Sequence, residues 1–178
     1  GRLKTLKKYV SKMLVIFPFE EAIYADAGVP VEFVGHPLID LAVATRSRGE
    51  TCRAAGLDPD RPVVALLPGS RPNELRLLLP TLVESAMRVA REVPGVQFLV
   101  ARAPALDDEL FASLQVLQTA GLTMAVLDGK TDDVLEAADV VITASGTATV
   151  QTALHHRPMV IVYRVSPVTY AIARRFVR

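Results

Sequence analysis

Seven short runs of Val, Ile, Leu, Phe and Met recur along the chain, and helical patterns lie between most of them. Most of these runs are apolar throughout rather than alternating, which is typical of strands that are covered on both faces. Repetition of strand, helix and strand over residues 63–178 predicts an α/β fold with a doubly wound, mostly parallel sheet. The predicted strands are Met13–Phe17, Val31–Val34, Val63–Leu67, Val96–Ala101, Thr123–Leu127, Val140–Thr143 and Met159–Tyr163.

Apolar residues at i, i+3 and i+4 spacing mark two of the helices between these strands. One stripe spans residues 82–90, and the other consists of Leu110, Leu114 and Leu117. Pro80 lies inside the first helical stretch and has no N–H to donate. We therefore expect a break there, with Pro80 opening a fresh helix.

Residues 1–45 differ from the rest of the chain. They read as a basic helix, a strand, a short helix and a second strand, and then a stretch punctuated by Gly35-His36-Pro37. This N-terminal extension is expected either to complete the sheet or to be the tail of a preceding domain. Residues 46–178 are expected to form one α/β domain. The chain opens with Gly rather than Met, which fits a piece cut from something longer.

Composition excludes several classes of protein. With 51% hydrophobic and 22% charged residues, the chain is not expected to be disordered. No apolar run approaches the roughly 18 residues that a membrane span needs. The single Cys52 excludes an internal disulfide and fits a reducing compartment.

Charge is nearly balanced, with 20 Lys and Arg against 19 Asp and Glu, so no nucleic-acid partner is expected. Both ends are nevertheless basic. Such ends suit an anionic membrane surface or a phosphorylated ligand, or are simply solvated termini. The basic residues at the ends are Arg2, Lys4, Lys7, Lys8, Lys12, Arg174, Arg175 and Arg178.

A first candidate anion site follows the strand Val63–Leu67. Ligands of open parallel sheets bind beyond the carboxyl ends of the strands, where loops enter helices. Gly69 allows close backbone approach, Ser70 adds a hydroxyl, and Arg71 supplies a planar fork that matches phosphate. Asn73 and Glu74 begin the next helix, whose free N–H groups would complete the site. The alternative is an ordinary turn with a surface arginine.

A second candidate loop follows the strand Val140–Thr143. Ser145, Gly146, Thr147 and Thr149 place small hydroxylated residues and a glycine at a helix start, with Ser145 expected to cap the helix. Thr147 and Gln151 are four residues apart and so share a helix face. Two such loops on one sheet edge favour a nucleotide diphosphate over a lone phosphate, although a plain capped helix remains the alternative.

Other polar residues at strand ends are weaker candidates. His36 is either a structural residue at a helix entry or a hydrogen-bond donor to phosphate. Lys130 could reach a neighbouring anion, Tyr163 could stack on a ring, and Arg164 could bind a phosphate or carboxylate. Asp58-Pro59-Asp60 reads as a turn, so no metal is expected. The chain lacks G-x-G-x-x-G and G-x-S-x-G, which weighs against a nicotinamide or flavin cofactor and a serine hydrolase.

Four segments together resemble the lipid A disaccharide synthases, two-domain glycosyltransferases of the GT-B type from Gram-negative bacteria. The resemblance covers nearly the whole chain, and the ordered set of GHPLID, LLPGSR, ASGTAT and YR is more specific than any one motif. The segments are FPFEEAIYADAGVPVEFVGHPLID (17–40), LLPGSRPNE (66–74), DGKTDDVLEAADVVITASGTATVQTAL (128–154) and MVIVYRVSPVTYAIARRFV (159–177).

The resemblance implies transfer of 2,3-diacylglucosamine from its UDP derivative to 2,3-diacylglucosamine 1-phosphate, without a metal or other cofactor. Residues 46–178 would then be the Rossmann-like half that binds the nucleotide-sugar donor. The implied diphosphate contacts are the two candidate loops, with Gln151 facing the ribose and Tyr163 and Arg164 lining the nucleotide pocket. The family typically has Glu at position 151, so ribose binding is expected to be weakened or rearranged here.

The acceptor-binding N-terminal domain of the family carries its candidate catalytic carboxylate and is not represented in this sequence. We therefore expect no catalytic residue in this chain and no turnover by these 178 residues alone. The implied location is cytoplasmic, peripheral to the inner membrane face. Residues 2–12 form a basic helix with a rough apolar stripe, which would bind acidic lipid or dock on the acceptor domain.

Two other functions share this architecture. A UDP-sugar 2-epimerase would be an isomerase and would need acid–base carboxylates and a histidine in the cleft, which these loops do not show. A non-catalytic nucleotide- or phosphate-binding module of flavodoxin-like shape is the other. Preference for UDP over UMP and ADP would support a sugar-donor site, and equal binding of all three would support a plain fold.

Overall fold

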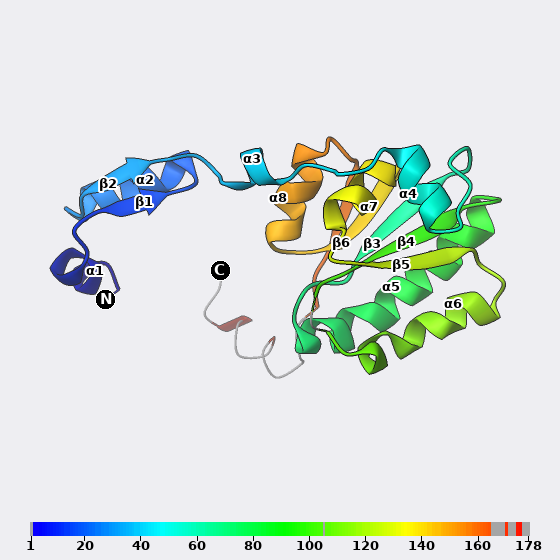
Figure 1. The fold of residues 1–178 in the computed structure, drawn as a ribbon. Coiled ribbons are helices and arrows are strands. Elements are labelled where there is room, and N and C mark those ends of the chain that lie inside the picture. The colour runs from blue at the N-terminus through cyan, green and yellow to red at the C-terminus, as the bar shows by residue number, and fades with distance from the viewer. Residues whose placement is uncertain (1, 105, 165–169, 171–173, 176–178) are drawn as a thin grey trace. The chain divides into compact units, whose positions relative to one another are not determined.

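The computed structural model describes residues 2–104, 106–164, 170 and 174–175. The chain divides into two compact units, Gly1–Ala42 and Val43–Arg178. Figure 1 traces both along the chain. Of the basic residues at the C-terminal end, Arg178 lies outside the described residues. No described helix is both long enough and apolar enough to cross a membrane.

The smaller unit is built around one parallel strand pair. Its strands β1 (Met13–Val15) and β2 (Val31–Phe33) pair from Met13 with Val31 onward, and helix α2 (Pro18–Asp26) connects them. Helices α1 (Arg2–Tyr9) and α3 (Leu38–Leu41) flank this β–α–β element in the sequence. The two strands form a sheet of their own, so the alternative in which residues 1–45 complete the larger sheet is not what is observed.

The larger unit contains a five-stranded sheet of order β5-β4-β3-β6-β7, in which every neighbouring pair is parallel. All seven predicted strands are present, with bounds that shift by at most two residues, and the predicted doubly wound fold is confirmed. The elements are α4 (Arg48–Ala54), β3 (Val63–Leu67), α5 (Pro72–Glu92), β4 (Gln97–Arg102), the 3₁₀-helix η1 (Asp108–Leu114), α6 (Gln115–Thr119), β5 (Met124–Asp128), α7 (Thr131–Ala137), β6 (Val140–Ala144), α8 (Thr147–Leu154) and β7 (Met159–Val162).

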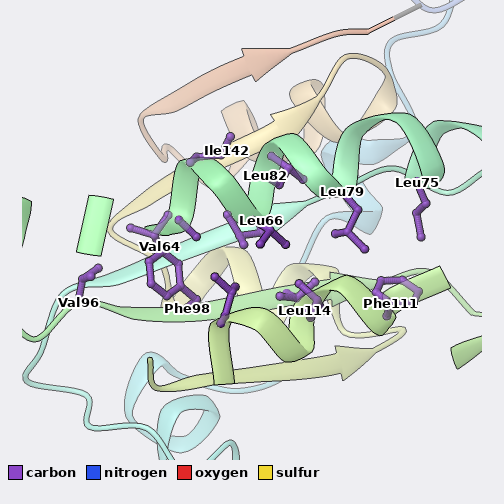
Figure 2. Close-up of a cluster of buried hydrophobic side chains, with 14 of the residues drawn as sticks. Val64, Leu66, Leu75, Leu79, Leu82, Val96, Phe98, Phe111, Leu114 and Ile142 are labelled. Atoms are coloured by element: carbon purple, nitrogen blue, oxygen red, sulfur yellow. The ribbon is translucent and has the colours of Figure 1, made fainter. Parts of the chain in front are cut away.

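Each face of the larger sheet carries its own apolar core. Because successive side chains of a strand point to opposite faces, Val64 and Leu66 of β3 face one core while Ala65 faces the other. Helices α5, η1 and α6 cover the first core, part of which Figure 2 shows. Helices α4 and α7 contribute to the second. Burial on both faces explains why these strands are apolar throughout.

The expected break at Pro80 is wrong, because α5 runs without interruption from Pro72 to Glu92. Pro80 lies on the exposed side of the helix, while the opposite side buries an apolar stripe against the sheet. Burial of that stripe outweighs the lost hydrogen bond of a proline inside a helix. The buried residues are Leu75, Leu78, Leu79, Leu82, Val83 and Ala86.

The second predicted stripe is buried, but its helix is not a single α-helix. Leu110 and Leu114 lie in η1, whereas Leu117 lies in α6. Leu114 and Leu117 are buried in the first core, and Leu110 packs against it. The apolar spacing therefore identified the face that packs, while the tighter helix type is a local adjustment at its start.

Arg48 ties α4 to the start of the central strand. Its guanidinium donates to both carboxylate oxygens of Asp139, at 2.9 and 3.0 Å. It also donates to the carbonyls of Pro59, Arg61 and Ala137. Asp139 in turn accepts the Val63 N–H, so one ion pair joins α4, the entry to β3 and the end of α7.

Asp133 ties the segment before α4 to α7 in a similar way. The residue is 3% exposed, and its carboxylate accepts the N–H groups of Thr45 and Arg46 at 2.6 and 3.0 Å, together with the Thr45 hydroxyl. Burial opposes ionisation of this carboxyl, but these hydrogen bonds outweigh burial and hold its pKa below the ordinary value of 3.8.

A lowered pKa in the folded state makes this contact sensitive to acid. Its contribution is present above the unfolded-state pKa and is lost as pH falls through the folded-state pKa. We expect Asp133→Ala to lower the free energy of unfolding at pH 7 by about 1–3 kcal/mol, because it removes a buried acceptor from two N–H groups. Urea unfolding measures this.

The matched control is Asp133→Asn, which keeps an Oδ1 acceptor for both N–H groups but does not titrate. Its loss at pH 7 should be smaller, and its stability should fall less than that of the parent chain between pH 7 and pH 3. An unchanged acid dependence in this variant would contradict the role given to Asp133.

Replacing Pro80 tests whether packing holds α5 together against a proline. We expect Pro80→Ala to raise the free energy of unfolding by about 1–2 kcal/mol. A hydrogen bond is regained, and this gain exceeds the entropy returned to the unfolded chain. Pro72→Ala is the control, because proline is compatible with the first helical position and its removal should not stabilise. A lower melting temperature for Pro80→Ala would contradict the explanation.

Candidate functional site

A cavity of about 330 Å³ lies at the carboxyl edge of the larger sheet. Strands β3, β4 and β6 end at it, and helices α5, α7 and α8 begin beside it. This is the edge at which parallel sheets bind ligands. The lining residues are Leu67, Gly69, Ser70, Arg71, Glu74, Ala101, Ala103, Thr131, Ala144, Ser145, Gly146, Thr147, Ala148 and Gln151.

The loop after β3 supplies one wall of the cavity. Gly69 has φ of +107°, and a Cβ there would lie 2.7 Å from Glu74 Oε2, so only glycine is accommodated without a shift. Arg71 precedes α5, is 78% exposed and donates to Glu74 Oε1 at 3.0 Å. Because Glu74 engages one Nη1–H, the guanidinium keeps further N–H groups for a ligand.

The loop after β6 supplies the facing wall. Gly146, not Ser145 as expected, is the residue that precedes α8, and its φ of +152° is one that only glycine adopts readily. Ser145 is exposed at the cavity, and its own N–H donates to Val162 O. Its hydroxyl is therefore not used as a cap, because the chain conformation at Gly146 moves the helix start forward by one residue.

The two walls meet because β3 and β6 are neighbours in the sheet. Leu67 pairs with Thr143, so the loops that follow these residues leave the sheet side by side. Helix α5, which follows β3, lies on one face of the sheet, and α7, which precedes β6, lies on the other. The direction of the crossovers therefore changes between β3 and β6. Arg71 and Thr147 consequently line the same cavity, as the two-loop interpretation requires.

Helix α7 contributes residues that sequence reasoning missed. Thr131 lines the cavity, and Asp132 Oδ1 accepts Gln151 Nε2 at 2.6 Å. His155 Nε2 lies 2.9 Å from the same oxygen. The sequence did place Thr131 and Asp132 at the start of the helix after β5, and β5 ends at the same edge of the sheet. That position could have identified them as site residues. Nothing in the sequence could have identified Ala101 and Ala103, because an alanine contributes space for a ligand and no polar group.

Six of the candidate residues do not line the cavity, five in the larger unit and His36 in the smaller one. Asn73 accepts from Arg76, and the Thr149 hydroxyl donates to Gly146 O within its own helix turn. Arg164 Nη1 is 3.2 Å from Thr81 Oγ1, in the middle of α5. The two others are Lys130, which directly precedes α7, and Tyr163, which is 71% exposed.

His36 belongs to the smaller unit and has a local role there. Its Nδ1 accepts the Leu38 N–H at 3.2 Å, and its ring lies against Phe17 with centroids 5.5 Å apart. These contacts hold the turn that leads into α3. They match the structural alternative for this residue.

The lining of the cavity suits an anion. The N-termini of α5, α7 and α8, several small residues and one arginine surround it, with Glu74 as the acidic side chain. Among the described residues, no cluster of three or more His, Cys, Asp or Glu side chains could hold a metal ion. Hydrogen bonds, helix dipoles and the Arg71 guanidinium are the means of charge stabilisation that the lining residues provide.

Solved structures share the fold of this chain at low sequence identity. Anabaena HepE, solved in complex with UDP and glucose, matches with a TM-score of 0.54 and 17% identity, over 89% of this chain and 46% of that one. The GtfA/B complex matches with a TM-score of 0.54 and 11% identity, over 95% of this chain and 33% of that one. The fold is that of a Rossmann-like half of a GT-B glycosyltransferase.

Sequence relatives are much closer. Lipid-A-disaccharide synthase of Geobacter sulfurreducens is 45% identical over 178 residues, which is 100% of this chain and 46% of that protein. The synthases of Myxococcus xanthus and Coxiella burnetii are 43% and 40% identical, over 98% and 100% of this chain and 45% and 46% of theirs. The chain spans about half the length of these relatives. The model of the lipid-A-disaccharide synthetase family matches residues 1–178, and the chain belongs to that family.

Proposed function

We propose that this chain binds the UDP-sugar donor of lipid A disaccharide synthesis. The proposed reaction transfers 2,3-diacylglucosamine from its UDP derivative to 2,3-diacylglucosamine 1-phosphate, forms a β-1,6 linkage and releases UDP. The observation that carries the proposal is the convergence of the loops after β3 and β6 on one cavity. The UDP bound by HepE, a protein of the same fold, supports a nucleotide as the ligand.

The diphosphate would bind between the N-termini of α5 and α8. In this arrangement Ser70 and Arg71 contact it from one loop, and Ser145, Gly146 and Thr147 contact it from the other. Departure of UDP leaves negative charge on the diphosphate, and preorganised N–H groups and a guanidinium lower the cost of forming that charge. Gln151, one turn into α8, would lie beside the ribose.

Tyr163 and Arg164 are proposed to line the nucleotide side of the site. Arg164 contacts Thr81, and Tyr163 is exposed. An exposed aromatic ring can stack on a base at little cost, and a guanidinium held by one neutral hydrogen bond can exchange it for a phosphate.

Acceptor binding and the catalytic base are proposed to reside in a separate domain of the longer proteins of this family. Among the residues that line the cavity, Glu74 is the carboxylate, and it is paired with Arg71. A carboxylate engaged by a guanidinium is a poor general base. The base that accepts the proton of the attacking hydroxyl is therefore assigned elsewhere.

A peripheral contact with the cytoplasmic face of the inner membrane is a further part of this proposal. Helix α1 carries four basic residues and buries none of its side chains in the smaller unit. Lysines beside an exposed Leu3 and Tyr9 suit an anionic lipid surface, where each basic residue adds about 1 kcal/mol. Lipid substrates would bring the enzyme to such a surface.

Calorimetry with UDP, UMP and ADP tests the nucleotide site. UDP should bind most tightly, because UMP lacks the second phosphate and ADP has the wrong base. Arg71→Ala should weaken UDP binding by about 10- to 100-fold, the loss of a hydrogen bond between charged groups, and UMP binding by less.

The control variant is Arg88→Ala, which removes an exposed arginine from the same helix, where it pairs with Glu84 away from the cavity. It should leave UDP affinity unchanged. Equal affinity for all three nucleotides, or equal losses in both variants, would overturn the sugar-donor site.

Co-sedimentation with vesicles that contain anionic lipid tests the membrane contact. The double substitution Lys7→Glu and Lys8→Glu should reduce the bound fraction several-fold, because it reverses two charges on α1. Arg88→Glu with Arg91→Glu makes the same change in net charge on α5 and should reduce binding less. Equal vesicle binding by the parent chain and the α1 variant would refute the contact.

A further inference from the structure

Asp132 connects the cavity to a buried histidine. Its Oδ1 accepts Gln151 Nε2 at 2.6 Å, and His155 Nε2 lies 2.9 Å from the same oxygen. Gln151 lies on α8, and His155 directly follows that helix, four residues along, so both face α7. One carboxylate oxygen therefore engages two successive turns of the helix that begins at the cavity.

Further contacts attach His155 and the residues after it to α7, on the side of Asp132 away from Gln151. The His155 side chain is 6% exposed, and its Nδ1 lies 3.7 Å from Glu136 Oε2. Arg157 Nη2 is 3.2 Å from the same Glu136 oxygen and also donates to the Glu136 carbonyl. The end of α8 is thus attached to α7 through Asp132 and Glu136.

The chemistry of the pair determines which end of the Gln151 amide meets Asp132. An ionised carboxylate only accepts hydrogen bonds, so the amide must present its NH₂ group to Asp132. The carbonyl oxygen Oε1 is then the polar atom left for other partners. Among the described residues, no hydrogen bond engages Oε1, and Gln151 lines the cavity.

We propose that Asp132 is a positioning residue that orients Gln151 so that Oε1 faces the ligand. This inference rests on the proposed function and adds a specificity to it. With Oε1 inward, the subsite accepts a hydrogen bond from a ligand hydroxyl and disfavours a ligand group that can only accept. The ligand chemistry that fits is a sugar hydroxyl, on either the ribose or the transferred sugar.

The orientation has a measurable consequence for affinity. The parent chain should bind UDP about tenfold or more tightly than at least one of 2′-deoxy-UDP and 3′-deoxy-UDP, because a lost hydroxyl leaves Oε1 without a partner. If UDP and both analogues bind equally, and the full UDP-sugar binds more tightly than UDP, the hydroxyl belongs to the transferred sugar. Discrimination is then measured with the corresponding deoxy-sugar.

Three variants test the role of Asp132. Asp132→Ala should reduce the discrimination to within about threefold, since the amide is then free to rotate. Gln151→Glu should weaken UDP binding, because it sets a second carboxylate against Asp132. Combining Gln151→Glu with Asp132→Asn should restore both binding and discrimination, because the new amide can donate to the new carboxylate and leave an acceptor facing inward.

That rescue separates a positioning role from a structural one. If Asp132 only held the fold together, placing the amide at position 132 and the carboxylate at position 151 would not restore binding. Asp128→Asn, a substitution at an exposed carboxylate that pairs with Arg102, is the control and should change nothing. Unchanged discrimination in Asp132→Ala, or a double variant no better than Gln151→Glu alone, would overturn the proposal. Melting temperatures identify any variant that fails to fold.

A readout without ligand distinguishes this inference from the proposed function. In a ¹⁵N-resolved NMR spectrum, one Gln151 side-chain NH proton should be shifted downfield by the carboxylate, and Asp132→Ala should return it to the usual range. If no nucleotide binds but this shift is present, the sugar-donor site fails while the orientation stands. If the shift is absent in the parent chain, the orientation is wrong whether or not UDP binds.

Discussion

The parallel pairing of β3 with both β4 and β6 is the constraint on which the rest of the larger unit depends. Parallel strands send all their following loops to one edge of the sheet, so the chain must return across a face each time. The returns after β3 and β4 use one face, and those after β5 and β6 use the other. The loops after β3 and β6 therefore start side by side and lead to helices on opposite faces, with the cavity between the two loops.

Burial and site formation are divided between different parts of the same strands. Their central residues fill two apolar cores, which fix the positions of the strand ends. Beyond the cores, Gly69 and Gly146 adopt positive-φ conformations that side chains rarely allow, and both line the cavity. A site lined largely by small side chains leaves room for a bulky anion.

Helix α7 links stability to the site. One of its two adjacent aspartates, Asp133, faces the segment before α4 and anchors the fold, while the other, Asp132, faces α8 and contacts a residue that lines the cavity. Neighbouring residues of a helix point about 100° apart, so a single turn can serve both purposes. The orientation of Gln151 in the cavity then depends on how α7 and α8 pack on the sheet.

The strands and the two glycine loops could be predicted from the sequence, because apolar runs and glycines act within a few residues of where they occur. The sequence could not show that α5 continues through Pro80, because this depends on whether burial of the leucine stripe outweighs the hydrogen bond that the proline removes. Nor could it pair Asp132 with Gln151, which are 19 residues apart, or place Arg164 beside Thr81. Those contacts require elements distant in sequence to pack at a particular distance and angle, and both quantities are set by the packing of the whole sheet and its helices.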